Sequence, residues 1–166
     1  MSQDILKCGF AALEFARKCT NSYLEAIPTD KWFHTPCENG NHAMWIIGHL
    51  AYADDLFLSV VNEGRGTKLD TTWAERFGMK STPSANAADY PEASEVRKTF
   101  DDMRNELFAF YEALPLEQLA DPTPEEFQAF APNKGQLLLT AACHESTHNG
   151  QLTVIRKSLK LEPVFA

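Results

Sequence analysis

Two histidines, His144 and His148, stand four residues apart in the C-terminal part of the sequence. Side chains with this spacing lie on one face of a helix, about one turn apart, so both imidazoles can point at a single metal ion. The alternative is a pair of core histidines that bond to each other or to nearby carbonyl groups. A tight metal site needs a third ligand as well.

An apolar stripe indicates which way this helix faces. Leu137, Ala141 and Ile155 share the helical spacing of the two histidines and of Gln151, so the stripe is apolar at both ends and polar in its middle. We therefore expect the histidines to point inward. A buried imidazole needs partners for both ring nitrogens, and a metal on one with a hydrogen bond on the other supplies them.

A third histidine, His49, lies in the middle of another apolar helical stretch. A second helix packed against the first can bring His49 to the same depth in the core, which would complete a three-histidine site. His42 lies seven residues earlier, about 10 Å along the helix axis, so one metal can hardly bind both. We expect His42 and His34 at the rim, where they support the ligands, contact a substrate or are merely exposed.

Four long stretches with helical periodicity must position these residues. They run approximately over residues 4–27, 42–63, 92–114 and 133–159, with Asn133 as the cap of the last. No convincing alternating strand separates them. We predict an all-α fold, a four-helix bundle forming one domain over residues 1–166.

The connection between the second and third helices is long, over about residues 65–89. Its glycines and prolines break any pattern, and Trp73 and Phe77 are expected to pin it to the bundle. A connection of this length closes one end of a pocket or joins parallel neighbouring helices.

Two further polar residues interrupt the predicted apolar faces. Arg17 lies within the stripe of the first helix, where it either snorkels at the edge of the bundle or binds an anion inside a pocket. Gln151 lies two turns after His144, so it bonds either a metal ligand or a neighbouring helix. Together with His42, these two residues are the candidates for contacts behind the ligands or in a pocket.

Composition excludes several classes of protein. The formal net charge of -8, without a dense basic cluster, argues against a nucleic-acid partner. No apolar run has the length of a signal peptide or a membrane span, so we expect a soluble, cytoplasmic protein with no membrane partner. The four cysteines form no Cys-x-x-Cys pair, so neither a disulfide framework nor a structural zinc knuckle is expected.

The segments NHAMWIIGHLA at residues 41–51 and HESTHNGQL at residues 144–152 resemble the DinB-like family. The resemblance covers essentially the whole chain. It implies a four-helix bundle that holds a divalent metal, zinc or nickel in most members, through three histidines, which by motif are His49, His144 and His148. It also suggests a homodimer. Known activities in the family include S-transferases that use bacillithiol or mycothiol, a related isomerase and a glutathione-using relative, and many members have no established reaction.

One other motif competes with this reading. Residues 144–148 fit the His-Glu-x-x-His pattern of zincin proteases, in which the glutamate is the general base. A metzincin would have glycine and histidine where this chain has Gln151 and Val154, and no strand is expected to cover the site. A ferritin-like di-iron bundle would need paired Glu-x-x-His motifs, which are absent.

Three neutral histidines leave a position open on the metal, and a thiol bound there would become a thiolate nucleophile near neutral pH. The leading hypothesis is a metal-dependent transferase that activates a low-molecular-weight thiol for S-transfer to an electrophile. A metal-dependent hydrolase, with water in the same position, is one alternative. A non-catalytic stress-response or binding protein, stabilised by its metal, is another. No catalytic residue and no cofactor besides the metal are assigned.

Overall fold

The computed structural model describes residues 2–64 and 68–165, and over these residues the chain is all-helical, with no strand. The all-α prediction is confirmed. Each long helix lies within a few residues of its predicted range. The α-helices are α1 (Ser2–Glu25), α2 (Ala43–Val61), α3 (Thr71–Phe77), α4 (Ala93–Ala113) and α5 (Lys134–Ser158). Short 3-10 turns lie at η1 (Thr29–Lys31), η2 (Ala87–Asp89), η3 (Leu116–Ala120) and η4 (Glu125–Phe127).

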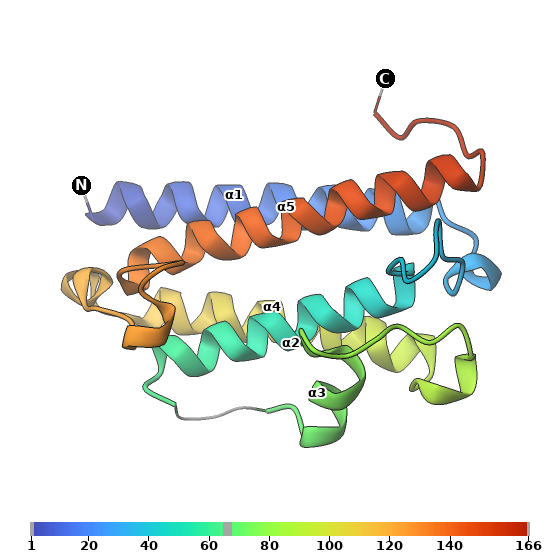
Figure 1. The fold of residues 1–166 in the computed structure, drawn as a ribbon. Helices are drawn as coiled ribbons and strands as arrows, with labels where there is room; N and C mark the ends of the chain where they lie inside the picture. Colours follow the sequence, from blue (N-terminus) through green and yellow to red (C-terminus); the bar gives the residue numbers. More distant parts are fainter. Residues whose placement is uncertain (1, 65–67, 166) are drawn as a thin grey trace.

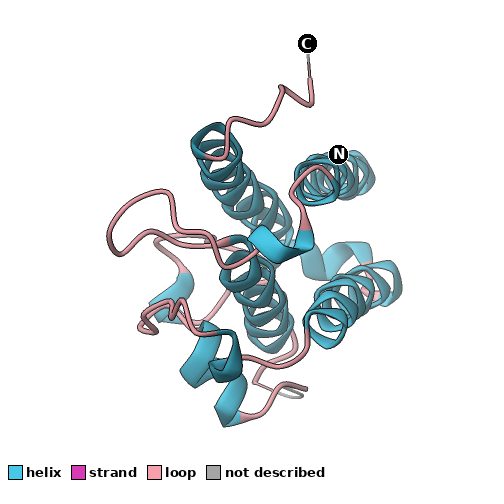
Figure 2. Ribbon diagram, turned by 90° about the vertical axis from the view of Figure 1, so that its right-hand side faces the viewer, coloured by secondary structure: helices cyan, strands magenta, loops and turns pink. Residues whose placement is uncertain are grey.

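The four long helices lie side by side in two pairs. Helix α1 packs along α5, and α2 packs along α4, while α2 also contacts α5 (Figure 1). The colour gradient in Figure 1 shows that the helices within each pair run in the same direction and that the two pairs run in opposite directions. The view along the helices in Figure 2 shows the short helix and the loops on the outside of this arrangement. The linker between α2 and α4 must therefore return along the length of the molecule.

The buried side chains form two apolar clusters with a polar layer between them. One cluster is centred on the first half of α2 and includes Ile46, Ile47 and Phe100. The other is centred on the second half of α2 and includes Val61 and Tyr111. Buried polar side chains from all four long helices occupy the levels in between: Arg17, Thr20, His49, Asp54, Arg104, Glu145, His148 and Asn149.

Helix α2 is the central apolar element of the fold. It is the one helix among the described residues that is long and apolar enough to cross a membrane, and 83% of that apolar window is buried inside the protein. A helix that is apolar on most faces and covered by its neighbours is typical of a core helix. This segment is therefore weak evidence for a membrane span.

The linker contains a helix that the sequence pattern did not predict. Helix α3 begins after Asp70, whose carboxylate accepts a hydrogen bond from the Trp73 backbone N–H at 2.9 Å. The Trp73 indole N–H donates to the carbonyl of Gly48 at 3.0 Å, and Phe77 is completely buried. The expected role of Trp73 and Phe77 in pinning the linker therefore agrees with the structure, but the linker is partly helical rather than wholly irregular.

Two helical glycines should respond to alanine in opposite directions. A Cβ on residue 48 would overlap the ring of Phe77, whereas one on residue 150 would meet open space. Gly48→Ala is expected to destabilise the protein by about 1–3 kcal/mol through overpacking. Gly150→Ala is expected to stabilise it by about 0.5–1 kcal/mol, since alanine favours the helix. Urea denaturation of both variants measures this, and equal effects would refute the close approach of α3 to α2.

Candidate metal centre

Three histidine side chains meet where α2 faces α5. His144 Nε2 lies 3.3 Å from His49 Nε2 and 3.2 Å from His148 Nε2. One nitrogen from each ring lies within 4.8 Å of the other two. His49 and His148 are buried, and His144 is half-buried. The fold thus brings together the three residues predicted as ligands, although they come from segments far apart in the sequence.

Hydrogen bonds at Nδ1, the ring nitrogen that faces away from the cluster, determine which nitrogen of His49 and of His148 is protonated. His49 Nδ1 lies 2.7 Å from the backbone carbonyl of Phe77, and His148 Nδ1 lies 3.0 Å from Gln151 Oε1. Both oxygens can only accept a hydrogen bond, so each Nδ1 must carry the proton and donate. In the neutral imidazoles, Nε2 of His49 and of His148 is then an unprotonated lone pair that points at the other histidines.

This arrangement fits a divalent cation with nitrogen ligands. A proton on His144 Nε2 could satisfy only one of the two facing lone pairs, whereas a cation satisfies all three nitrogens. Bonds of zinc to histidine in a tetrahedral site place ligand nitrogens about 3.3 Å apart, close to the distances here. The donor set of His49, His144 and His148 is therefore suited to a metal ion.

Burial keeps the three imidazoles neutral. Desolvation, followed by the neighbouring histidines His148 and His49, lowers the pKa of His144 to about 3. Desolvation, followed by His49, lowers the pKa of His148 to about 4, and desolvation also lowers the pKa of His49. Because a metal binds the unprotonated ring, the site is ready to coordinate at neutral pH.

The family model of the DinB superfamily matches residues 12–152. The chain belongs to the DinB superfamily. The match includes the two segments that supply the three histidines, His49 in α2 and His144 and His148 in α5. No curated protein matches the chain. Membership of the superfamily therefore supports the helical fold of this DinB protein but does not indicate an activity.

Gln151 stands behind one of the three histidines. Its Oε1 accepts from His148 Nδ1 and, at 3.1 Å, from Asn41 Nδ2. Asn41 thus fixes the position of the Gln151 amide group, which in turn orients the His148 ring. Asn41 was not among the site residues expected from the sequence, and its place at the start of the segment NHAMWIIGHLA was the signal for this role.

Gln151→Ala is expected to weaken metal binding by about 10- to 100-fold, because the partner that orients His148 and raises its basicity is lost. The fold should persist, since Gln151 is only half-buried. Gln151→Glu keeps an acceptor and should keep most of the affinity. Gln136→Ala, at an exposed position on the same helix, is the control. Competition with a chelator measures the affinities, and equal values for Gln151→Ala and the control would contradict this role.

His42 does not lie at the rim as expected from the sequence. It is the N-cap of α2 and completely buried. Its Nδ1 accepts from the Trp45 backbone N–H at 3.0 Å, and its Nε2–H donates to the carbonyl of Ser84 at 2.9 Å. Both nitrogens are used, so His42 fixes the start of α2 and touches no ligand histidine. His34 bonds Ser158 Oγ at 2.8 Å and is not in the three-histidine cluster.

The cap role of His42 predicts a pH effect on stability. Burial lowers the pKa of His42 below its usual 6.5 in the folded protein. The unfolded chain therefore takes up the proton first, and the stabilisation is complete above pH 6.5 and is lost as the pH falls toward the folded pKa. His42→Ala should cost about 1 kcal/mol at pH 7.5, and His42→Asn, which can still cap, should cost less. Urea denaturation at pH 7.5 and 5.5 should show a weaker pH dependence for His42→Asn than for the wild type; an equal dependence would contradict the assignment.

Arg17 is neither at the edge of the bundle nor free to bind an anion. Its side chain is almost completely buried, with Nε 2.9 Å from Glu145 Oε1 and Nη2 3.2 Å from Asp54 Oδ2. Its guanidinium carbon lies 3.4 Å from the centre of the Phe100 ring. The edge position expected for Arg17 is therefore wrong, and its guanidinium is already paired with carboxylates of the protein itself.

Arg17 belongs to a buried ion cluster of four residues. Asp54 accepts from Arg104 Nε at 2.8 Å, and Arg104 Nη2 lies 2.8 Å from Glu145 Oε2. Arg17 comes from α1, Asp54 from α2, Arg104 from α4 and Glu145 from α5, so each long helix gives one charge and the charges balance.

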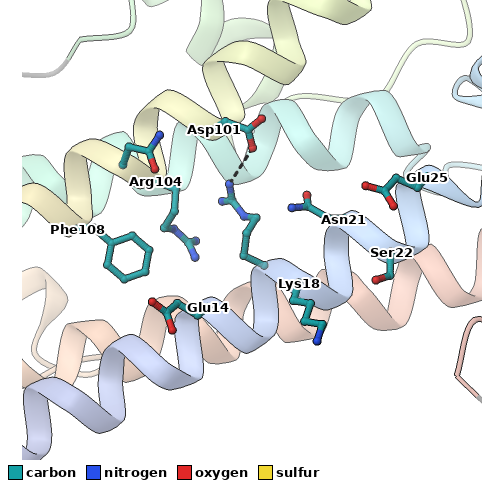
Figure 3. Close-up of a pocket in the computed structure, with 10 residues that line it drawn as sticks. Glu14, Lys18, Asn21, Ser22, Glu25, Asp101, Arg104 and Phe108 are labelled. Atoms are coloured by element: carbon teal, nitrogen blue, oxygen red, sulfur yellow. Dashed lines mark ion pairs between the residues drawn. The ribbon is translucent and has the colours of Figure 1, made fainter.

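Beside this ion cluster, an open groove of about 540 Å³ runs between α1 and α4 (Figure 3). Lys18 and Glu14 on α1 and Asp101 on α4 carry charges of both signs along its walls. Arg17 Nη1 reaches Asp101 at 3.7 Å, as the dashed line in Figure 3 marks. None of the three clustered histidines lines this groove.

Glu145 cannot act as the general base that the zincin pattern requires. Its side chain is completely buried and accepts from Thr20 Oγ1 at 2.6 Å as well as from Arg17. Burial alone would raise its pKa, but Arg17, Arg104 and Thr20 lower it below the usual value. A carboxylate held ionised by these partners is a structural anion, so the protease interpretation is wrong.

Proposed function

We propose that this DinB-superfamily protein binds zinc or nickel through His49, His144 and His148 and uses it to activate a low-molecular-weight thiol. The chain would be a single-domain four-helix bundle over residues 1–166, with a long linker between α2 and α4 as in the DinB-like family that it resembles. The convergence of three Nε2 atoms, two of them oriented by outer hydrogen bonds, carries the metal part of the proposal.

The incomplete donor set supports catalysis rather than a purely structural role. Over residues 2–64 and 68–165, the candidate ligand cluster contains three histidines and no cysteine or carboxylate. Structural zinc sites usually have four protein ligands, whereas catalytic sites keep one position for water or substrate. An apolar cavity borders His49 and His144, so a ligand can reach the site from that side.

The cation would lower the pKa of a thiol or water that enters the site. His49 and His148 present fixed lone pairs, because Phe77 and Gln151 hold their outer N–H groups. The side chains that line the adjoining cavity are mostly apolar, which would limit the water beside the reacting atoms. The thiolate sulfur would form a bond to the electrophilic carbon, the leaving group would depart with its electron pair, and the thiol proton would pass to solvent.

A homodimer in the cytoplasm is part of the same proposal. Ile5 and Phe15 on α1 expose 42% and 68% of their surfaces, which favours an apolar contact between two copies. Sedimentation velocity would give a monomer if this part of the proposal is wrong.

Metal-loaded protein should conjugate at least one thiol of a panel containing glutathione, bacillithiol and mycothiol with an electrophile such as monochlorobimane or 1-chloro-2,4-dinitrobenzene. The activity should disappear with a chelator and in His144→Ala. A product carrying hydroxyl in place of the thiol would establish the hydrolase instead. No reaction with any pair, together with metal-dependent thermal stabilisation, would favour the non-catalytic binding protein.

A further inference from the structure

An apolar cavity of about 190 Å³ opens directly onto two of the three clustered histidines. We infer that this cavity binds an uncharged, apolar group of the electrophilic substrate and places its reacting carbon beside the metal. The inference rests on the proposed transferase function and names the class of substrate that the function would take.

The cavity is built from segments that are distant in the sequence. Helix α2 supplies Leu56 and Phe57, and α5 supplies Leu137. Phe127 and Phe130 come from the segment before α5, and Met79 follows α3. Aromatic and aliphatic walls of this kind are typical of small-molecule sites, in which few polar groups fix the orientation of the ligand.

Apart from the two histidines, the polar side chains of the lining carry only hydroxyl groups, on Tyr52 and Thr140. Among residues 2–64 and 68–165, no lysine, arginine, aspartate or glutamate borders the cavity. The Thr140 hydroxyl is within hydrogen-bond distance of the carbonyl groups of Phe130 and Gln136, at 2.9 and 3.2 Å. Away from the histidines, a charged group in the cavity would lose its hydration without compensation, whereas an apolar group gains from the transfer.

The histidines set the direction in which a ligand would lie. His49 and His144 border the cavity, but His148 does not. Phe57 meets the His144 ring edge-on, with ring centres 5.9 Å apart. An apolar group that fills the cavity therefore reaches the cluster from the side of His49 and His144.

Volume and exposure limit the ligand. An engineered apolar cavity of about 150 Å³ binds benzene, so a volume of 190 Å³ suits a group of about seven to nine non-hydrogen atoms. Met79 and Phe130 expose 75% and 74% of their surfaces beside this cavity. A bound apolar ligand would cover part of this exposed carbon surface, which favours binding.

Fluorine NMR of metal-loaded protein tests the inference with two probes of similar size. Fluorobenzene, which is neutral and within this size limit, should bind at least tenfold more tightly than 4-fluorobenzylammonium, which is within the limit as well. Thr140→Phe should weaken the neutral probe at least tenfold by filling the cavity. Leu139→Phe adds a ring at the neighbouring, exposed position outside the cavity and should change nothing.

Leu56→Ala provides a second variant that enlarges the cavity instead of filling it. It should improve binding of the larger 1-fluoronaphthalene relative to fluorobenzene by at least fivefold. Equal binding of the neutral and charged probes, or unchanged binding in both Thr140→Phe and Leu56→Ala, would overturn the inference.

The inference and the proposed function can fail separately. Probe binding requires neither a thiol nor a reaction, so a neutral probe that binds to a protein without conjugating activity supports the cavity and refutes the transferase. If conjugation occurs but Thr140→Phe leaves KM for apolar electrophiles unchanged, the transferase stands and the cavity assignment fails.

Discussion

Replacing His144 with alanine is expected to lower the affinity for zinc or nickel by well over 100-fold. The cluster offers only three donor nitrogens, and loss of one leaves two, too few for a tight site. Even residues that only orient a ligand are worth about 10- to 100-fold in affinity, so loss of a ligand itself must exceed this. His49→Ala and His148→Ala should behave alike. Metal content after dialysis, with chelator competition for affinity, measures the effect.

His34→Ala is the matched control, because His34 bonds Ser158 and is not in the cluster. It should bind metal as the wild type does. Circular dichroism should show that each variant stays helical in the absence of metal. Full metal occupancy in His49→Ala would mean that α2 does not supply a ligand, and the metal centre as described would be wrong.

Glu145→Ala is expected to destabilise the protein by about 3–5 kcal/mol, measured by urea denaturation. Glu145 is completely buried, and its removal leaves Arg17 and Arg104 to share one buried carboxylate, that of Asp54. The large cost arises from the buried charge that loses its partner rather than from the net value of the ion pair. Glu145→Gln should lose nearly as much, because it keeps the shape and removes the charge.

An exposed ion pair on the same protein gives the contrast. Lys98 and Asp102 pair one turn apart on the surface of α4. Lys98→Ala should change the free energy of unfolding by at most about 0.5 kcal/mol, since exposed pairs are screened by water and salt. Comparable losses in Glu145→Ala and Lys98→Ala would show that the buried ion cluster does not hold the helices together.

Helical periodicity was sufficient to place the three histidines. The spacing of His144 and His148 within an apolar stripe indicated which face of α5 points inward, and the central position of His49 in α2 indicated its depth. Local side-chain order along a helix follows from the backbone geometry alone, so such patterns are readable in sequence. Gln151 lay in the same stripe and was found in the same way.

The environment of Arg17 could not be predicted from helical periodicity. Its counter-ions Asp54 and Glu145 stand on two other helices, and no local pattern relates those positions. A single arginine in an apolar stripe suggests an edge position only while its counter-ions are unknown. His42 was misplaced for a related reason: its acceptor Ser84 lies in the linker, where no periodicity fixes the path of the chain.

Short elements were also missed. Helix α3 has seven residues, too few for an apolar period, although Asp70 before Thr71 was a cap signal in the sequence. The apolar cavity beside the histidines depends on Phe127 and Phe130, which come from a proline-rich segment. Their inward position is decided by tertiary packing and not by a repeating pattern.

The buried charge that each long helix contributes to the ion cluster restricts how these helices can slide along one another. Apolar stripes repeat every turn, so α5 could slide by one turn, about 5.4 Å, and still bury carbon against α2. Such a slip would move Glu145 away from Arg17 and Arg104, with which it pairs, while Asp54 on α2 kept both arginines. We therefore expect the four charges to fix the axial position of each long helix relative to the others. This register keeps the donor nitrogens of the three histidines aligned, whereas the residue types that line the cavity can change.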